Sequence, residues 1–407
     1  MQKTRLRKYA QLIARMGINV QKGQDVMVNA GLDQPEFVAM VTEELYKAGA
    51  RKVFVKFNYQ PLEKYHVRYR SLKALSTVES FEEEEIKYTA ENLCARLFLR
   101  SDSPDGLKGV NTEKMAKGIQ GRFPVSTRYR ELNDGKHQWC IAAVPGKEWA
   151  KKVFPGERAG KAVELLWGAI LSAARVDDDP IAAWQKHNDD IHARCSYINS
   201  LGIDSLEYKA SNGTDLRVGM IEGANFTGGS KPIPTGTYFN ANIPTEECYI
   251  SPDRSRADGI VYSTKPLVYQ GQIIDNFYFR FEGGKVVEAH AEVNDDLLQK
   301  MVSMDEGSAR LGECALVPFD SPINQTGLLF YLTLFDENAC CHLALGRGFK
   351  DTMPNGANLT MDEAKALGLN DAMIHVDFMI GTADLSIIAN CRDGKRVELF
   401  KNGTWAW

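Results

Sequence analysis

The sequence has no apolar run of the roughly 18–20 residues that a helix needs to cross a bilayer. It also carries little excess charge, because 49 lysines and arginines stand against 53 aspartates and glutamates, for a net charge of −4. We therefore expect neither a membrane protein nor a protein that binds nucleic acid through bulk electrostatics. The basic segment Met1–Lys8 is not followed by an apolar stretch, so we do not expect a secretory signal.

Two further patterns are missing. The eight cysteines are scattered and lack a C-x-x-C spacing, so we expect reduced thiols of a cytoplasmic protein and no disulfide framework. The turn Gly31–Pro35 lacks the Gly-x-Gly-x-x-Gly fingerprint, which argues against a dinucleotide site there.

The chain has 407 residues, which is long for one core and favours two domains. Residues 1–200 are expected to form an α/β domain with a parallel sheet and flanking helices. Strand-like Asp25–Ala30, a helix that opens at Pro35, and strand-like Lys52–Phe57 form a βαβ pattern. Further helices are predicted in this domain at 4–16, 147–153, 159–174 and 180–199, and further strands are predicted at 95–99 and 139–144.

The sequence pattern changes in residues 201–407, where short strand patterns are separated by Asn-Gly, Gly-Gly and Asp-Gly turns. Helices are expected only at Asp295–Val302 and Met361–Leu367. We therefore predict a β-rich α+β domain, and all the residues that point most clearly to chemistry lie in it.

The most informative stretch is 372–381, which alternates as a β-strand. Ile374, Val376 and Phe378 fall on one face, while His375 and Asp377 fall on the other. An imidazole and a carboxylate two residues apart on a strand point the same way, as metal ligands must. By itself this pattern is more often a hydrogen-bonded pair.

Four other residues are candidates in the same domain: Glu246, Glu247, Glu313 and His342. Each alone has an ordinary reading, as a surface acid or a core histidine. Together with His375 and Asp377 they fit a centre in which two divalent ions share at least one carboxylate. Adjacent glutamates on an extended chain point to opposite sides, so only one of Glu246 and Glu247 should be a ligand.

Several competing patterns are weaker. Cys340 or Cys341 beside His342 suggests a cysteine hydrolase, but neighbours on an extended chain point apart. A second metal cluster would come from Glu288, His290 and Glu292, for which an exposed strand face is the simpler interpretation. The acids before Pro180 are read as a helix cap. The other two histidines considered are interpreted as surface residues, and they are His187 and His192.

At these residues the chain resembles the thermophilic-metalloprotease family of aminopeptidases, of the aminopeptidase T and S type, over nearly its whole length. The most specific matching stretches are Asn242–Glu247, Asp336–Asn338 leading into His342–Gly346, and His375–Gly381. The resemblance implies a two-metal aminopeptidase acting on peptides with a free N-terminus, with zinc or cobalt and with manganese or magnesium as alternatives. It also implies a two-domain subunit and a homodimer. The ligands that carry over are Glu247, Glu313, His342, His375 and Asp377.

Two questions stay open at this point. The general base is Glu246 or Glu313. Phe349 stands where the family commonly has a tyrosine, so a hydrogen-bond donor to the oxyanion is missing unless a metal or Arg347 compensates. The alternative to an enzyme is a metal- or peptide-binding protein whose site has decayed. The preferred side chain at the substrate N-terminus cannot be predicted from these patterns.

Overall fold

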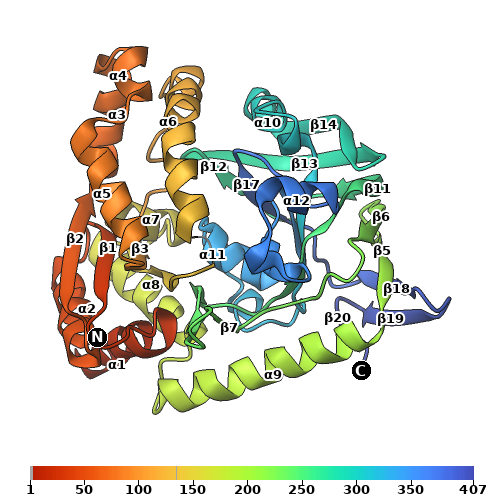
Figure 1. The fold of residues 1–407 in the computed structure, drawn as a ribbon, viewed down its shortest axis with the longest axis horizontal. Coiled ribbons are helices and arrows are strands. Elements are labelled where there is room, and N and C mark those ends of the chain that lie inside the picture. The colour runs from red at the N-terminus through yellow and green to blue at the C-terminus, as the bar shows by residue number, and fades with distance from the viewer. Residues whose placement is uncertain (1–2, 134) are drawn as a thin grey trace. The chain divides into compact units, whose positions relative to one another are not determined.

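The computed structural model describes residues 3–133 and 135–407 (Figure 1). The chain divides into two units. The first comprises Met1–Lys186, Ser230–Pro244 and Gln270–Gln272, and the second comprises His187–Gly229, Thr245–Tyr269 and Ile273–Trp407. The second unit contains every candidate ligand named above.

The first unit is built on a parallel sheet in the order β2-β1-β3-β4-β9. Its strands are β1 (Asp25–Gly31), β2 (Lys52–Asn58), β3 (Ala95–Arg100), β4 (Trp139–Ala143) and β9 (Asn242–Ile243). Apolar side chains of the central strands, such as Val26, Val28 and Leu97, are buried because a parallel sheet with helices on it is covered. The predicted α/β architecture of the N-terminal region is confirmed.

The helices of the first unit begin and end where local chemistry favours it. Helix α2 (Pro35–Ala48) has its proline in the first turn and ends at Gly49, whose φ of 118° suits glycine. The remaining helices are α1 (Lys3–Leu12), η1 (Ile13–Gly17), α3 (Gln60–Tyr69), α4 (Leu72–Ser76), α5 (Ser80–Glu91), α6 (Thr112–Asn133), α7 (Lys147–Val153) and α8 (Ala159–Ala173). Helix α6, which packs on α4 and α5, was not predicted (Figure 1).

Helix α9 (Pro180–Ser200) contains the point at which the chain passes from the first unit to the second. The carboxylate of Asp179 accepts a hydrogen bond of 3.0 Å from the backbone N–H of Ala182. The predicted helix cap is therefore confirmed. Asp179 belongs to neither group of possible metal ligands found among the described residues.

The second unit contains a large antiparallel sheet in the order β12-β13-β11-β6-β5-β18-β19-β20, with β14 paired to β13. Its strands are β5 (Ile203–Lys209), β6 (Asp215–Met220), β11 (Pro252–Tyr262), β12 (Leu267–Tyr269), β13 (Gln272–Glu282), β14 (Lys285–Val293), β18 (Ser386–Cys391), β19 (Arg396–Lys401) and β20 (Thr404–Trp405). The predicted β-rich C-terminal region is thus confirmed, as are helices α10 (Asp295–Val302) and α12 (Met361–Ala366).

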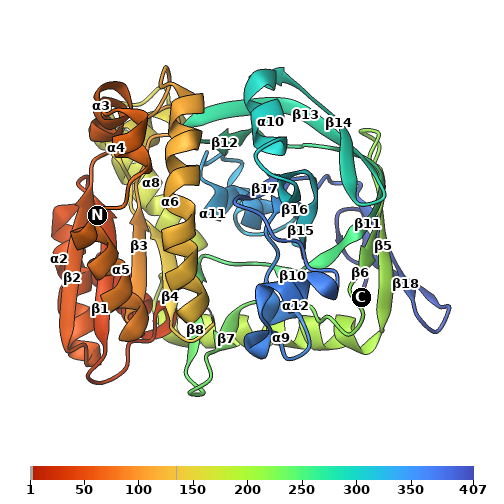
Figure 2. The same ribbon diagram turned by 45° about the horizontal axis from the view of Figure 1, so that its top comes forward.

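A smaller antiparallel sheet in this unit has the order β10-β15-β16-β17 (Figure 2). Its strands are β10 (Cys248–Ile250), β15 (Leu311–Leu316), β16 (His342–Gly346) and β17 (His375–Met379). Glu313, His342, His375 and Asp377 lie on its strands, and Glu247 directly precedes β10. Two short strands, β7 (Ser230–Pro232) and β8 (Tyr238–Asn240), pair in the first unit. Among the described residues, no helix is both long and apolar enough to span a bilayer.

Candidate metal centre

The register of the four-stranded sheet gathers candidate ligands on one face. Ala344 on β16 lies opposite Glu313 of β15 on one side and opposite Asp377 of β17 on the other. Directly opposed residues share a face, and so do residues two apart on a strand. His342 and His375 therefore face the same side as Glu313 and Asp377, and the small Ala344 leaves space between them.

Five side chains form what we call the carboxylate–histidine cluster: Glu247, Glu313, His342, His375 and Asp377. They fall into two groups that share Glu313, and within each group one ligand atom per residue lies within 4.8 Å of the others. Glu247 belongs with His342, and His375 belongs with Asp377. The structure thus brings together the five residues that the resemblance implied.

Glu313 faces both histidines with different oxygens. Its Oε1 is 4.0 Å from Nε2 of His342, and its Oε2 is 3.1 Å from Nε2 of His375. Within the first group, Oε2 of Glu247 lies 3.3 Å from Nε2 of His342. A carboxylate with one oxygen toward each group has the geometry of a bridging ligand.

The imidazoles are oriented by backbone carbonyls. Nδ1 of His342 lies 2.8 Å from the carbonyl oxygen of Glu337, and Nδ1 of His375 lies 2.7 Å from that of Arg347. A carbonyl only accepts, so each Nδ1 carries a hydrogen and each Nε2 presents a lone pair to the cluster in the neutral ring. This arrangement is typical of metal-binding histidines.

One buried carboxylate oxygen of the cluster lies where a cation would stabilise it. Within the described residues, Oδ1 of Asp377 has no hydrogen-bond partner, yet it lies 3.1 Å from Nε2 of His375. Two lone pairs at that distance repel each other unless a proton or a cation lies beside them. The nitrogen and oxygen donors of the cluster are those that divalent transition metals accept.

Crowding of the carboxylates also shifts their protonation. Burial raises the pKa of Glu313 to about 7, although His375 opposes the shift. Burial lowers the pKa of His342, but Glu247 outweighs that effect and raises it to about 9. Burial would raise the pKa of Asp377, but the charge of His375 lowers it. Protons thus supply positive charge that a bound dication would otherwise supply.

Sequence reasoning missed a further acid at the cluster, Glu337. It is buried in the turn η4 (Glu337–Ala339), where burial and the charges of Asp377 and Glu247 raise its pKa well above its ordinary value. In the sequence, only its place in the matching stretch Asp336–Asn338 pointed to it, and no role was predicted for it. Its Oε1 accepts a hydrogen bond from Nδ2 of Asn338 at 3.3 Å.

Glu246 lies differently from Glu247. Its Oε2 is 3.7 Å from Nε2 of His187, and its backbone N–H donates to Asn338. The placement of His187 on the surface was wrong: the ring is 8% exposed and contacts the carbonyl of Thr245 at 2.7 Å. The contact joins residues far apart in sequence, which helical periodicity cannot reveal.

The competing sites are not assembled. Glu288 bonds to Tyr278 and Arg280, and His290 lies near Asp295, so this strand face is exposed and already paired. Burial raises the pKa of Cys340 to about 11, so its thiol does not ionise near neutral pH. Among the described residues, neither pattern forms a catalytic group.

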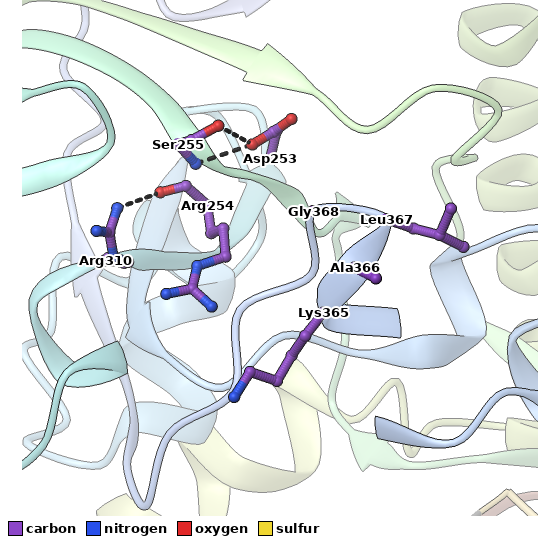
Figure 3. A pocket seen from close by; sticks show the side chains of 8 residues that line it. All are labelled: Asp253, Arg254, Ser255, Arg310, Lys365, Ala366, Leu367 and Gly368. Atoms are coloured by element: carbon purple, nitrogen blue, oxygen red, sulfur yellow. Dashed lines mark hydrogen bonds between the residues drawn. The ribbon is translucent and has the colours of Figure 1, made fainter. Parts of the chain in front are cut away.

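A separate open pocket of about 450 Å³ lies elsewhere in the second unit (Figure 3). Its lining residues are Asp253, Arg254, Ser255, Arg310, Lys365, Ala366, Leu367 and Gly368. Asp253 accepts from Ser255, and Arg310 donates to the Arg254 carbonyl. None of the cluster residues lines this pocket, so it is not part of the candidate centre.

Comparison with known proteins identifies the family of this chain. Residues 2–405 match the family described as thermophilic metalloprotease (M29). The chain belongs to this family. It is 38% identical over 405 residues to aminopeptidase AmpS of Bacillus subtilis (strain 168), covering 99% of this chain and 98% of that relative. It is 36% identical over 408 residues to aminopeptidase T of Thermus aquaticus, covering 98% of each.

The structural comparison extends over the complete fold. Wild-type AmpT from Thermus thermophilus superimposes with a TM-score of 0.90 at 34% identity, covering 100% of both chains. The predicted fold and the predicted class, a hydrolase of the metallo-aminopeptidase type, are therefore confirmed at the level of the family.

Phe349, where the resemblance predicts a tyrosine, lies beside the cluster. Its ring centroid is 4.7 Å from that of His375 and 5.7 Å from that of Tyr249. Arg347, the other residue considered for compensation, has its guanidinium 3.9 Å from the Asp371 carboxylate. This distance favours a structural ion pair for Arg347 over a role in the reaction.

Proposed function

We propose that this protein is an aminopeptidase that releases N-terminal amino acids from peptides and uses two divalent metal ions. The observation that carries the proposal is Glu313, which presents one oxygen to each of two ligand groups. Glu247 and His342 would hold one ion, and His375 and Asp377 would hold the other. Zinc or cobalt suits these nitrogen and oxygen donors, with manganese or magnesium as alternatives.

The bound ions would supply two kinds of chemistry, lowering the pKa of a water molecule and polarising the scissile carbonyl. The three carboxylates leave one unit of positive charge on two dications, which favours deprotonation of water near neutral pH. Burial of the cluster, in which Glu313 is 4% exposed, excludes bulk water and strengthens these effects.

A side chain must carry the proton from water to the leaving amine. Glu313 is a poor choice if both its oxygens are occupied as ligands, and Glu246 is directed toward His187. Glu337 is buried beside the charged groups of the cluster, and in this scheme it is not a metal ligand. We therefore favour Glu337 as the proton carrier and keep Glu246 as the second choice.

We also propose that the enzyme is a homodimer of the cytoplasm. All eight cysteines are free and buried, as suits a reducing compartment. Strand β2 lies at the edge of its sheet with Phe54 39% and Phe57 45% exposed, which is the kind of surface that association would cover. Light scattering of the wild type and of Phe57→Asp tests this: a dimer that Phe57→Asp weakens is expected, and a monomeric wild type would contradict it.

The central test measures hydrolysis of leucyl anilide and bound metal together. Chelation should abolish turnover, and returned zinc or cobalt should restore it. His375→Ala should lose metal and at least about a hundred-fold in kcat/KM while the chain stays folded. His290→Ala is the matched control, since this exposed histidine lies outside the cluster.

Three outcomes would contradict the proposal. Full activity in metal-free protein would exclude the metal-dependent mechanism. Stoichiometric metal and tight peptide binding without cleavage would favour the alternative, a binding protein with a decayed site. An N-acetylated peptide should resist hydrolysis, and its cleavage at the same rate would show an endopeptidase.

A further inference from the structure

Phe349 presents an apolar surface directly beside the carboxylate–histidine cluster. Its ring is tilted 51° against the imidazole of His375 at a centroid distance of 4.7 Å. The residue is only half-buried, whereas core rings such as Phe279 and Phe378 are at most 1% exposed. Phe349 therefore keeps some exposed surface next to a cluster of polar side chains.

The backbone of Phe349 is fixed on both sides. Its N–H donates to Oγ of Ser251 at 2.8 Å, and its carbonyl accepts from Oγ1 of Thr352 at 2.8 Å. Both hydroxyl-bearing residues are almost completely buried, at 0% and 1% exposure. The backbone that carries the ring is thus held by hydrogen bonds to buried hydroxyl groups, with which solvent cannot easily compete.

The ring of Phe349 also packs against the ring of Tyr249. This tyrosine lies opposite Ala315 on the neighbouring strand, on the cluster face of the sheet. Its ring meets Phe349 edge to face at 5.7 Å, and its hydroxyl donates to Asp351 at 3.2 Å. Tyr249 therefore braces the segment that follows Phe349, and its hydroxyl is engaged in doing so.

We propose that Phe349 is a specificity-determining residue that selects substrates with an apolar first side chain. The inference rests on the proposed function, because an aminopeptidase must hold both the α-amine and the scissile carbonyl of the first residue at the cluster. The side chain of that residue would then lie near His375, whose imidazole contacts the phenyl ring. Contact with the ring removes apolar area from water and favours leucine or phenylalanine at this position.

The polarity of the first side chain adds discrimination. An acidic side chain that lies against the phenyl ring loses the water that solvates its charge and gains no hydrogen bond from the ring. We therefore expect glutamyl substrates to be the poorest, alanyl substrates intermediate, and leucyl or phenylalanyl substrates the best.

The experiment compares kcat/KM for leucyl, phenylalanyl, alanyl and glutamyl anilides in metal-loaded enzyme. Phe349→Ala should lower the leucyl-to-alanyl ratio by about ten-fold or more, mainly through KM, with metal content unchanged. Phe349→Leu should keep the leucyl preference but lose the phenylalanyl preference, because it keeps bulk and loses the ring. Phe81→Ala is the matched control, since Phe81 is 71% exposed in the first unit, and it should change nothing.

The two proposals fail differently. A wild type that cleaves none of the four substrates with metal bound would contradict the proposed function. An active wild type whose substrate ratios are the same in Phe349→Ala or, should that variant not fold, in Phe349→Leu would overturn the role of Phe349 alone. A general loss of kcat for every substrate, with ratios preserved, would also overturn it, because it would indicate a structural role.

Discussion

Removal of metal should make the stability of this protein fall as the pH rises across the neutral range. In the metal-free cluster, burial raises the pKa of Glu313 from 4.5 to about 7. The pKa of His342 rises from 6.5 to about 9, because Glu247 outweighs the lowering by burial. Both values exceed those of the unfolded chain, so the folded protein binds more protons than the unfolded one.

The sign of the effect follows from this difference. The stabilisation is fully present below the unfolded pKa and is lost as the pH rises through the folded pKa. The window is therefore 4.5 to about 7 for Glu313 and 6.5 to about 9 for His342. The lowered pKa of Asp377 acts only when the pH falls below its ordinary value of 3.8, outside this range.

The magnitude is measurable. A pKa that moves from 4.5 to about 7 corresponds to about 3 kcal/mol of folding free energy. Since Glu313 and His342 belong to one cluster, we take about 3 kcal/mol for the cluster as a whole. For a unit of about 200 residues, this corresponds to a Tm lower by about 6–12 °C at pH 8.5 than at pH 5.5.

Thermal unfolding of chelated and metal-loaded protein at the two pH values tests the argument. Metal replaces the protons, so the gain in Tm on loading should be larger at pH 8.5 than at pH 5.5. In chelated Glu313→Gln, the fall in Tm that Glu313 causes below about pH 7 should be lost. The control Glu288→Gln changes an exposed, paired acid and should keep this fall in Tm. A chelated protein whose Tm is flat or rises with pH, together with an equal gain on metal loading, would refute the reasoning.

Two further predictions concern the ligands and the space between them. Glu247→Gln should reduce bound metal and kcat/KM by at least about a hundred-fold, whereas Glu246→Gln should keep its metal; the reverse result in metal analysis would exchange the two roles. Ala344→Val adds two carbons between Glu313 and Asp377. It should weaken metal binding by at least ten-fold at a cost of about 1–3 kcal/mol, while Ala389→Val, at another fully buried alanine, should affect stability alone.

The sequence predicted the inner strands of the first unit well, because β1, β3 and β4 carry buried apolar residues and are separated by helices. Strand β1 and helix α7 have the predicted bounds within one residue. Helix α6 was missed because only Gly118, Tyr129 and Asn133 are buried along it and Pro124 lies within it. A helix that is mostly exposed has no continuous apolar stripe from which periodicity could be recognised.

The candidate centre was predictable only in part, because its assembly depends on pairing between distant strands. Alternation along 372–381 correctly places His375 and Asp377 on one face, and that step is local. Whether Glu313 lies opposite Ala344, and not one residue away, is set by the register of β15 and β16, which includes an irregularity between Leu311 and Glu313. A slip of one residue would turn this carboxylate to the opposite face of the sheet. The ligand types are therefore encoded locally, but their convergence is a property of the folded sheet, and for this chain only the family resemblance could anticipate it.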